Sequence, residues 1–194
     1  MTVNRQEARS RATRAKLVRA ARPLFARKGF AAAGTEEIVR RAGVTRGALY
    51  HQFPAKEDLF EAVYEQVEQE LTERVVLGLG EIESPMAALR AGLRAFLAEC
   101  AAPEVQRIVL IDGPAVLGWE RWRAVAARYG LGLIENEVRL AIEAREIAPM
   151  PAGPVAHLLM GALDEAALLV VREPEAVEAS AAALERMLDG LRPG

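Results

Sequence analysis

The 194-residue chain contains very few of the side chains on which catalytic and metal sites depend. It has one cysteine, Cys100, and two histidines, His51 and His157. A single cysteine cannot form an internal disulfide, and a zinc site needs more ligands than this chain brings together. No nucleophile lies at a spacing that pairs it with a base. We therefore expect neither enzymatic activity nor a bound metal or cofactor.

Aromatic residues are also scarce, at 5% of the chain, although hydrophobic residues together make up 52%. Ala and Leu dominate the apolar set, and no stretch alternates polar and apolar residues with the β-branched enrichment typical of strands. The composition thus predicts an all-α protein with enough apolar residues for a core.

Long hydrophobic runs are missing as well. The most apolar stretch, 158–171, is interrupted by Asp164 and Glu165 and is shorter than the roughly 20 residues that cross a bilayer. The first 17 residues are charged but lack the apolar core of a secretory signal. Together with the lone cysteine, these features predict a cytoplasmic protein without a membrane segment.

Charge is distributed unevenly along the chain. Residues 1–58 contain 13 basic and 5 acidic residues, a net charge of +8, whereas the remainder contains 12 basic and 22 acidic residues, a net charge of −10. This asymmetry has two interpretations: the N-terminal third binds a polyanion, or it only carries a solvated basic helix face. The Arg11, Arg14 and Lys16 cluster has the same two interpretations.

The basic third predicts three helices. The first spans about 9–28, because apolar residues recur there with helical spacing, and Gly29 ends it; Pro23 is expected to kink it. A short helix follows from Thr35, a good N-cap, to Gly43. After the glycine turn, Thr45 caps a third helix that continues to Phe53. The stretch 35–53 is therefore a helix-turn-helix, which in DNA-binding proteins places its second helix in the major groove.

The residues of the third helix suit that task. Leu49 and Phe53 lie four apart and anchor the helix to the core, which leaves Gly47 and His51 on the opposite face. Arg46 sits at the N-terminal end, where an arginine reaches a guanine edge, and small Gly47 permits a close approach to the bases. Tyr50, Thr35 and Lys56 are within reach of phosphates. His51 either contacts DNA or is merely solvated.

These residues resemble a known family. The stretch “TEEIVRRAGVTRGALYHQFPAKEDLF” is similar to the DNA-binding domain of TetR/AcrR-family bacterial transcriptional repressors, and the resemblance covers about residues 10–60. It implies about nine helices, with a head at 1–55 and an effector-binding and dimerisation domain at 56–194. It also implies a homodimer formed by the last two helices. The candidate DNA-binding residues are Thr35, Thr45, Arg46, Gly47, Tyr50, His51 and Lys56, with Gln52 less certain. Glu36 departs from the family pattern, and it either reads a cytosine or stabilises the helix start.

The C-terminal two thirds carry no comparably specific motif. Further helices are expected at 85–101, 104–112, about 115–147, 154–172 and 175–190, the last two being apolar on more than one face. Aromatic, sulfur-containing and histidine side chains suggest a ligand pocket, with ordinary core packing as the alternative; these candidates are Met86, Phe96, Trp119, Trp122, His157 and Met160. We therefore expect a homodimeric repressor that binds a pseudo-palindromic operator in double-stranded DNA and responds to an unknown small molecule. The alternative is a regulator that responds to a protein partner or to no small molecule.

Overall fold

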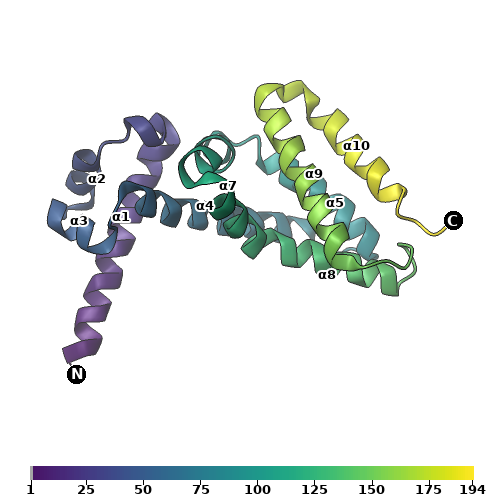
Figure 1. The fold of residues 1–194 in the computed structure, drawn as a ribbon, viewed down its shortest axis with the longest axis horizontal. Helices are drawn as coiled ribbons and strands as arrows, with labels where there is room; N and C mark the ends of the chain where they lie inside the picture. Colours follow the sequence, from purple (N-terminus) through teal and green to yellow (C-terminus); the bar gives the residue numbers. More distant parts are fainter. Residues whose placement is uncertain (1) are drawn as a thin grey trace.

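The computed structural model describes residues 2–194, with side chains from Gln6 onward, and this part of the chain is helical without strands. A compact head of three helices sits at one end of an elongated molecule, and the C-terminal bundle occupies the other (Figure 1). The head consists of α1 (Thr2–Ala32), α2 (Thr35–Ala42) and α3 (Arg46–Gln52). The long helix α4 (Lys56–Leu79) runs from the head into the bundle and packs against both α1 and α5. The all-α prediction is confirmed.

The bundle is formed by the remaining helices, of which α9 and α10 lie on the side opposite the head (Figure 1). In chain order these are α5 (Pro85–Glu99), α6 (Pro103–Val105), η1 (Gln106–Asp112), α7 (Gly113–Ala126), η2 (Ala127–Leu131), α8 (Gly132–Glu143), α9 (Ala152–Arg172), η3 (Pro174–Ala176) and α10 (Val177–Asp189). The sequence predicts a long helix at about 115–147 in which Gly118, Gly130 and Gly132 are candidate breaks, and the structure interrupts it at two of these places. Its α-helical parts are separated by the π-helical segment η2, and α7 also leaves helical geometry at Gly118, where φ is 74°.

Helix α1 contains both Pro23 and Gly29. The backbone leaves helical geometry at Gly29, the predicted end of the helix, where φ is 75° and ψ is 168°, whereas Pro23 keeps helical dihedral angles. A positive φ favours glycine, since it has no Cβ to clash with the carbonyl. A side chain at position 29 would also overlap the Arg107 guanidinium. Gly29 therefore sets the bend that leads from α1 toward α2.

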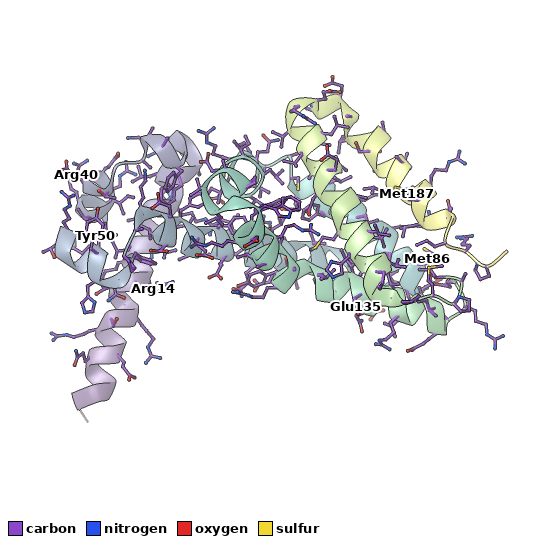
Figure 2. The ribbon with its side chains drawn as sticks, viewed as in Figure 1. Arg14, Arg40, Tyr50, Met86, Glu135 and Met187 are labelled. Atoms are coloured by element: carbon purple, nitrogen blue, oxygen red, sulfur yellow. The ribbon has the colours of Figure 1, made fainter. Side chains whose placement is uncertain are left out.

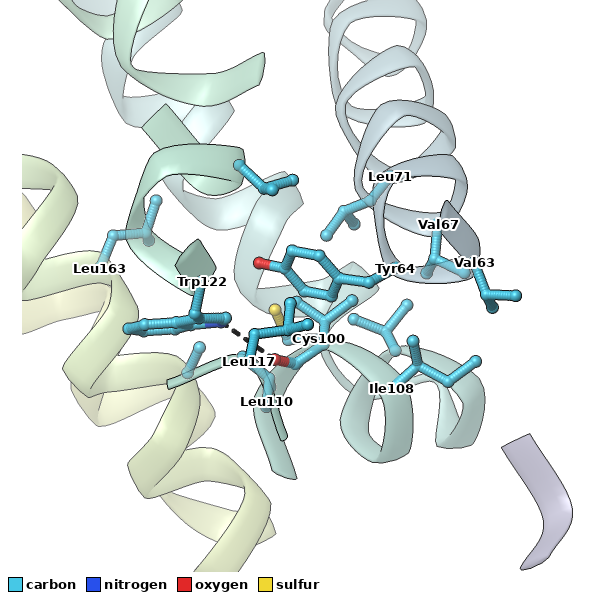
Figure 3. Close-up of a cluster of buried hydrophobic side chains, with 14 of the residues drawn as sticks. Val63, Tyr64, Val67, Leu71, Cys100, Ile108, Leu110, Leu117, Trp122 and Leu163 are labelled. Carbon is cyan, nitrogen blue, oxygen red and sulfur yellow. Dashed lines mark hydrogen bonds between the residues drawn. The ribbon is translucent and has the colours of Figure 1, made fainter. Parts of the chain in front are cut away.

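The core is continuous from the head into the bundle. In its central part, Tyr64 of α4 faces Trp122 of α7 across aliphatic side chains (Figure 3). The Trp122 indole Nε1 donates a hydrogen bond to the Val109 carbonyl at 3.2 Å, so this buried polar group is satisfied. Cys100 is fully buried at this place, as expected for a small apolar side chain, and burial raises the pKa of its thiol. The aromatic pair thus joins α4 to η1 and α7.

Helix α9 is the one segment of the described chain that is long and apolar enough to cross a membrane by length and composition alone. It nevertheless packs against α5, α8 and α10, and its Asp164 forms an ion pair with Arg123 of α7. Only 33% of its most apolar window is buried within the single chain. Its packing and its interior charge are those of a bundle helix with one uncovered side.

Candidate functional site

Helix α3 is held in place by local signals on both sides. Gly43 ends α2 in the left-handed conformation, with φ 65° and ψ 36°. Thr45 Oγ1 then accepts a hydrogen bond from the Ala48 backbone N–H at 3.1 Å, which confirms the predicted N-cap. Leu49 and Phe53 are each only 1% exposed, so the predicted anchor residues do face the core. Seven residues form a stable helix here because the cap and the anchors fix it from outside.

The opposite face of α3 is open to solvent. Arg46, Gly47, Tyr50 and His51 are all exposed, and Tyr50 retains 40% of its surface. The Arg46 guanidinium lies 5.7 Å from the centre of the Tyr50 ring, within the range of a cation–π contact. Tyr50 points away from the bundle (Figure 2). The face therefore presents a cation and two hydrogen-bonding rings around a residue without a side chain.

Gly47 is not required by the fold. Its φ is not positive, and a Cβ at this position would meet nothing closer than Thr45 Oγ1 at 3.9 Å. Gly43 differs, since its left-handed backbone does favour glycine. The open space at Gly47 thus lies on the exposed side of α3, where an external partner could approach the backbone closely.

Two further candidate DNA contacts differ in their surroundings. The helix α2 begins one residue earlier than expected: Gly34 is the N-cap and its carbonyl accepts from Ile38 N–H at 3.2 Å, so the capping role expected for Thr35 is wrong. The Thr35 hydroxyl makes no hydrogen bond to the described residues. The Lys56 ammonium, by contrast, donates to the Phe30 carbonyl and lies 4.2 Å from the Phe30 ring centre, and burial lowers its pKa. Lys56 therefore also connects α4 to the end of α1.

The surface around α3 is basic. Exposed cations from α1 and α2 flank it, including Arg9, Arg11, Arg40 and Arg41, and the labelled Arg40 lies on the same outer side as Tyr50 (Figure 2). Arg14 stacks over Phe53 at 4.3 Å, and Gln52 Nε2 donates to Ser10 Oγ at 2.9 Å, which fixes the first half of α1 beside α3. Glu36 is exposed in the first turn of α2, where a carboxylate interacts favourably with the helix dipole.

Polar contacts connect the head to the bundle. The Phe30 N–H donates to Asp112 Oδ2 of η1 at 2.7 Å. Arg22 of α1 donates to Glu70 of α4 and to Glu104 of α6 at 2.8–2.9 Å, and these carboxylates raise the pKa of the guanidinium further above its ordinary value. Both contacts are half-buried, and they join η1, α4 and α6 to α1.

A cavity of about 380 Å³, partly open to solvent, lies in the bundle. Its walls come from the second half of α4, from α5, from the η2–α8 region and from α9. The lining is mostly aliphatic, with Leu89, Leu93, Leu133, Ile134 and Phe96 among its members. A concave, mainly apolar space with a few polar groups is typical of a small-molecule site.

The polar lining consists of acids and one threonine. Glu68, Glu137, Asp164 and Thr72 face the cavity, and no basic residue is among its described lining residues. The Tyr64 hydroxyl donates to Glu68 Oε1 at 2.9 Å, and burial raises the pKa of Glu68 to about 7. Burial likewise raises the pKa of Asp164 to about 6, although Arg123 opposes this change. Burial thus makes ionisation of either acid costly.

The structure brings only part of the predicted pocket together. Phe96 and Met160 line the cavity, whereas Met86, Trp119, Trp122 and His157 lie outside it. Trp122 belongs to the core beside Tyr64, Met86 is buried near the start of α5, and His157 is exposed on α9. Trp119 is 67% exposed and stacks with Arg123 at 5.6 Å. The lining prediction therefore needs correction at these four positions, because helical spacing alone does not say which face meets the cavity.

Sequence reasoning did not identify Glu68. It lies next to Val67 and four residues after Tyr64, within the apolar side of α4. A carboxylate within an apolar helical stripe was the available signal, because an acid is rarely buried without a reason. Asp164, by contrast, is indicated by the sequence, since it lies seven residues after His157 on one predicted helix, where it either lines a pocket or faces a dimer partner; it lines the cavity.

Both parts of the chain match known protein families. Residues 17–63 match the family model described as “Bacterial regulatory proteins, tetR family”, and residues 86–191 match the one described as “Tetracyclin repressor-like, C-terminal domain”. The Escherichia coli “Transposon Tn10 TetC protein” is 25% identical over 158 residues, which are 81% of this chain and 80% of that protein.

Solved structures agree over nearly the full length. A TetR-family transcriptional regulator from Pectobacterium atrosepticum has a TM-score of 0.84 and 32% identity, covering 96% of this chain and 97% of that one. RolR, solved in complex with resorcinol, has a TM-score of 0.75 at 22% identity, covering 93% of this chain and 89% of that one. The latter likeness concerns the fold.

Proposed function

The chain belongs to the TetR family of bacterial transcriptional regulators, which are DNA-binding proteins and not enzymes. We propose that it is a cytoplasmic, homodimeric repressor controlled by a small-molecule effector. The effector occupies the cavity between α4, α5, α8 and α9. The operator is pseudo-palindromic, since a two-fold dimer presents two copies of α3 to two half-sites.

The exposed face of α3 is the observation that carries this proposal. Arg46, Gly47, Tyr50 and His51 are free of their own chain, and a basic surface surrounds them. Arg46 supplies the base contact, Gly47 supplies the close approach, and Thr35, Thr45, Tyr50, His51 and Lys56 supply contacts around them. Thr45 keeps its hydroxyl proton for a phosphate, because its capping bond uses the oxygen as acceptor.

The cavity supports the effector part of the proposal. A filled interior would have favoured a regulator of the alternative kind, one that responds to a protein partner or to no ligand. A cavity of about 380 Å³ with convergent carboxyl groups favours a sensor of small molecules. The likeness to the resorcinol-bound RolR structure adds that this fold accommodates a small aromatic ligand in that protein.

The long helix α4 offers a route from cavity to head. Its second half lines the cavity, and Lys56 at its first residue bonds the Phe30 carbonyl at the end of α1. A ligand that binds one placement of α4 more tightly than another shifts the population of head positions by that difference in affinity. The spacing of the two α3 helices in the dimer then changes relative to the operator.

The uncovered side of α9 and α10 supports the dimer. Leu158 of α9 is 74% exposed, and Met187 of α10 is 52% exposed. Gly161 and neighbouring alanines allow a second pair of helices to approach closely. A four-helix contact between two copies would cover these side chains.

The proposal is tested by measuring binding to duplexes from the region upstream of the chain's own gene. We expect Arg46→Ala to lose most of the preference for the operator over an unrelated duplex, since a bidentate arginine–guanine contact contributes about 1–3 kcal/mol of discrimination. Arg139→Ala is the matched control, because Arg139 is exposed on α8 and pairs only with Glu143 and Asn136. Equal operator preference in both variants would contradict the assigned role of α3.

A further inference from the structure

We propose that the ligand of the bundle cavity is an apolar molecule with a single positive charge, such as a protonated amine, and that its charged group binds Glu68. This inference rests on the proposed effector function, because it concerns the ligand of the same cavity. It is carried by the charges that line the cavity, by the position of the Glu68 carboxyl group and by the apolar walls around it.

The charges of the cavity have one sign. Glu68, Glu137 and Asp164 are the ionisable residues among the described lining, contributed by α4, α8 and α9. Arg123, which lies behind the lining, pairs with Asp164 and balances one of the three. Among the described residues, the other two carboxyl groups have no basic partner, so an anionic ligand would find repulsion and no cation to bind.

Glu68 is the acid placed to receive a cation. Its side chain is only 6% exposed, and Oε1 accepts from the Tyr64 hydroxyl. Oε2 makes no hydrogen bond to the described residues. Every fully enclosed side-chain oxygen among these residues has a hydrogen-bond partner, so Oε2 is not fully enclosed. Oε2 therefore opens onto the cavity that Glu68 lines. A ligand ammonium there would offset the cost of a buried carboxylate.

The rest of the cavity suits an apolar body. Leu89 and Leu93 of α5, with Leu133 and Ile134 of α8, form opposing aliphatic walls, and Phe96 adds an aromatic ring. The volume of about 380 Å³ is near the lower end of the roughly 300–1,000 Å³ usual for ligand pockets. A compact aromatic or alkyl amine fits this combination of size and polarity.

The charged surroundings of Glu68 make the binding pH-dependent. Tyr64 lies on the same helix as Glu68, and Cys100 lies at the end of α5. Asp164 of α9, which pairs with Arg123, and Glu137 of α8 line the same cavity as Glu68. Burial raises the pKa of Glu68 to about 7. Because a cation binds the ionised carboxylate, its affinity should be greatest above this pH and fall by up to about tenfold per unit below it.

Three probes with one skeleton test the proposal: 4-phenylbutylamine, 4-phenylbutan-1-ol and 4-phenylbutanoate. Calorimetric titration of the full-length protein at pH 8 should show the amine binding at least about tenfold more tightly than the alcohol, with no detectable binding of the carboxylate. Glu68→Gln should abolish the advantage of the amine. Glu73→Gln, an exposed acid of the same helix outside the cavity, should leave it unchanged.

A second variant keeps the test independent of how Glu68→Gln folds. Asp164→Asn removes the partner of Arg123, so the carboxylate probe should begin to bind while the amine weakens. The proposal is overturned if the amine binds no better than the alcohol, or if its advantage survives Glu68→Gln in a folded variant.

Operator affinity measured with the same probes separates this inference from the proposed function. An amine that binds the cavity without changing operator affinity would support the ligand class and overturn the effector role. An alcohol or carboxylate that alone changes operator affinity would support the effector role and overturn the ligand class.

Discussion

Single residues in the head divide into those that the fold needs and those that it does not. Gly43 has a left-handed backbone, and Gly29 has a positive φ of 75°. Gly47 has neither constraint, and Arg46, Tyr50 and His51 contribute exposed surface rather than core. Residues that cost the fold nothing to replace, grouped on one face, are the expected composition of a contact surface.

Gly43, at the end of α2, and Gly47, within α3, give a prediction that separates stability from binding. Gly47→Ala should leave thermal stability unchanged or slightly higher, because the added methyl group has open space and helix propensity improves, but it should weaken operator binding by crowding the DNA. Gly43→Ala should lower the free energy of unfolding by about 1–2 kcal/mol through its left-handed backbone. Thermal melts and fluorescence anisotropy on both variants measure the two effects. Unchanged operator affinity in Gly47→Ala would argue against a close approach at this position.

At the scale of the element, α4 has two different ends. Its first residue bonds the head, its middle contributes Phe60, Tyr64 and Leu71 to the core, and its second half faces the cavity. Glu68 interrupts the apolar side of this helix. A buried acid in such a place lowers stability whenever it is ionised, which a purely structural core would avoid.

Stability should therefore depend on pH through Glu68. The folded-state pKa of about 7 lies above the ordinary value of 4.5, so the folded protein retains the proton over this interval while the unfolded chain loses it. Stability from this group is greatest below pH 4.5 and falls as the pH rises through 7, by about 2–3 kcal/mol between pH 5 and pH 8. Glu68→Gln should remove this loss, so denaturant unfolding should show the variant as the more stable protein at pH 8. A pH dependence equal to that of the parent protein would exclude a buried, titrating Glu68.

At the scale of the whole molecule, the charge is segregated with the shape. The head, in which the basic residues concentrate, lies at one end of the molecule, and α9 and α10 lie at the other (Figure 1). Leu158 of α9 and Met187 of α10 are exposed there. In the proposed repressor, this separation would let one surface bind DNA while the other binds a second copy, without competition between them. The ion pairs of Arg22 and the Phe30–Asp112 bond join the two parts mechanically.

The proposed dimer predicts the effect of a charge introduced on the exposed side of α9. Leu158→Asp should convert the dimer to a monomer and reduce operator binding, because a carboxylate would be buried in the contact. Leu77→Asp is the matched control, since Leu77 is 82% exposed on α4, which packs mainly against α1, α5 and α7. Analytical ultracentrifugation of both variants gives the oligomeric state. A dimer that persists in Leu158→Asp would place the contact elsewhere.

The sequence alone determined the fold class, the helix-turn-helix and the family, because helical spacing, the glycine and threonine signals and the motif of the head all act locally. It also placed Leu49 and Phe53 inside and Arg46 and His51 outside, since one short helix with two anchors has only one possible orientation. Only the tertiary structure decided which of the candidate breaks interrupt the helices, Pro23 or Gly29 in α1 and the glycines within 115–147, and which residues line the cavity. Those features depend on which helix faces meet across the bundle, and contacts such as Gly29 with Arg107 or Asp164 with Arg123 join residues that are far apart along the chain.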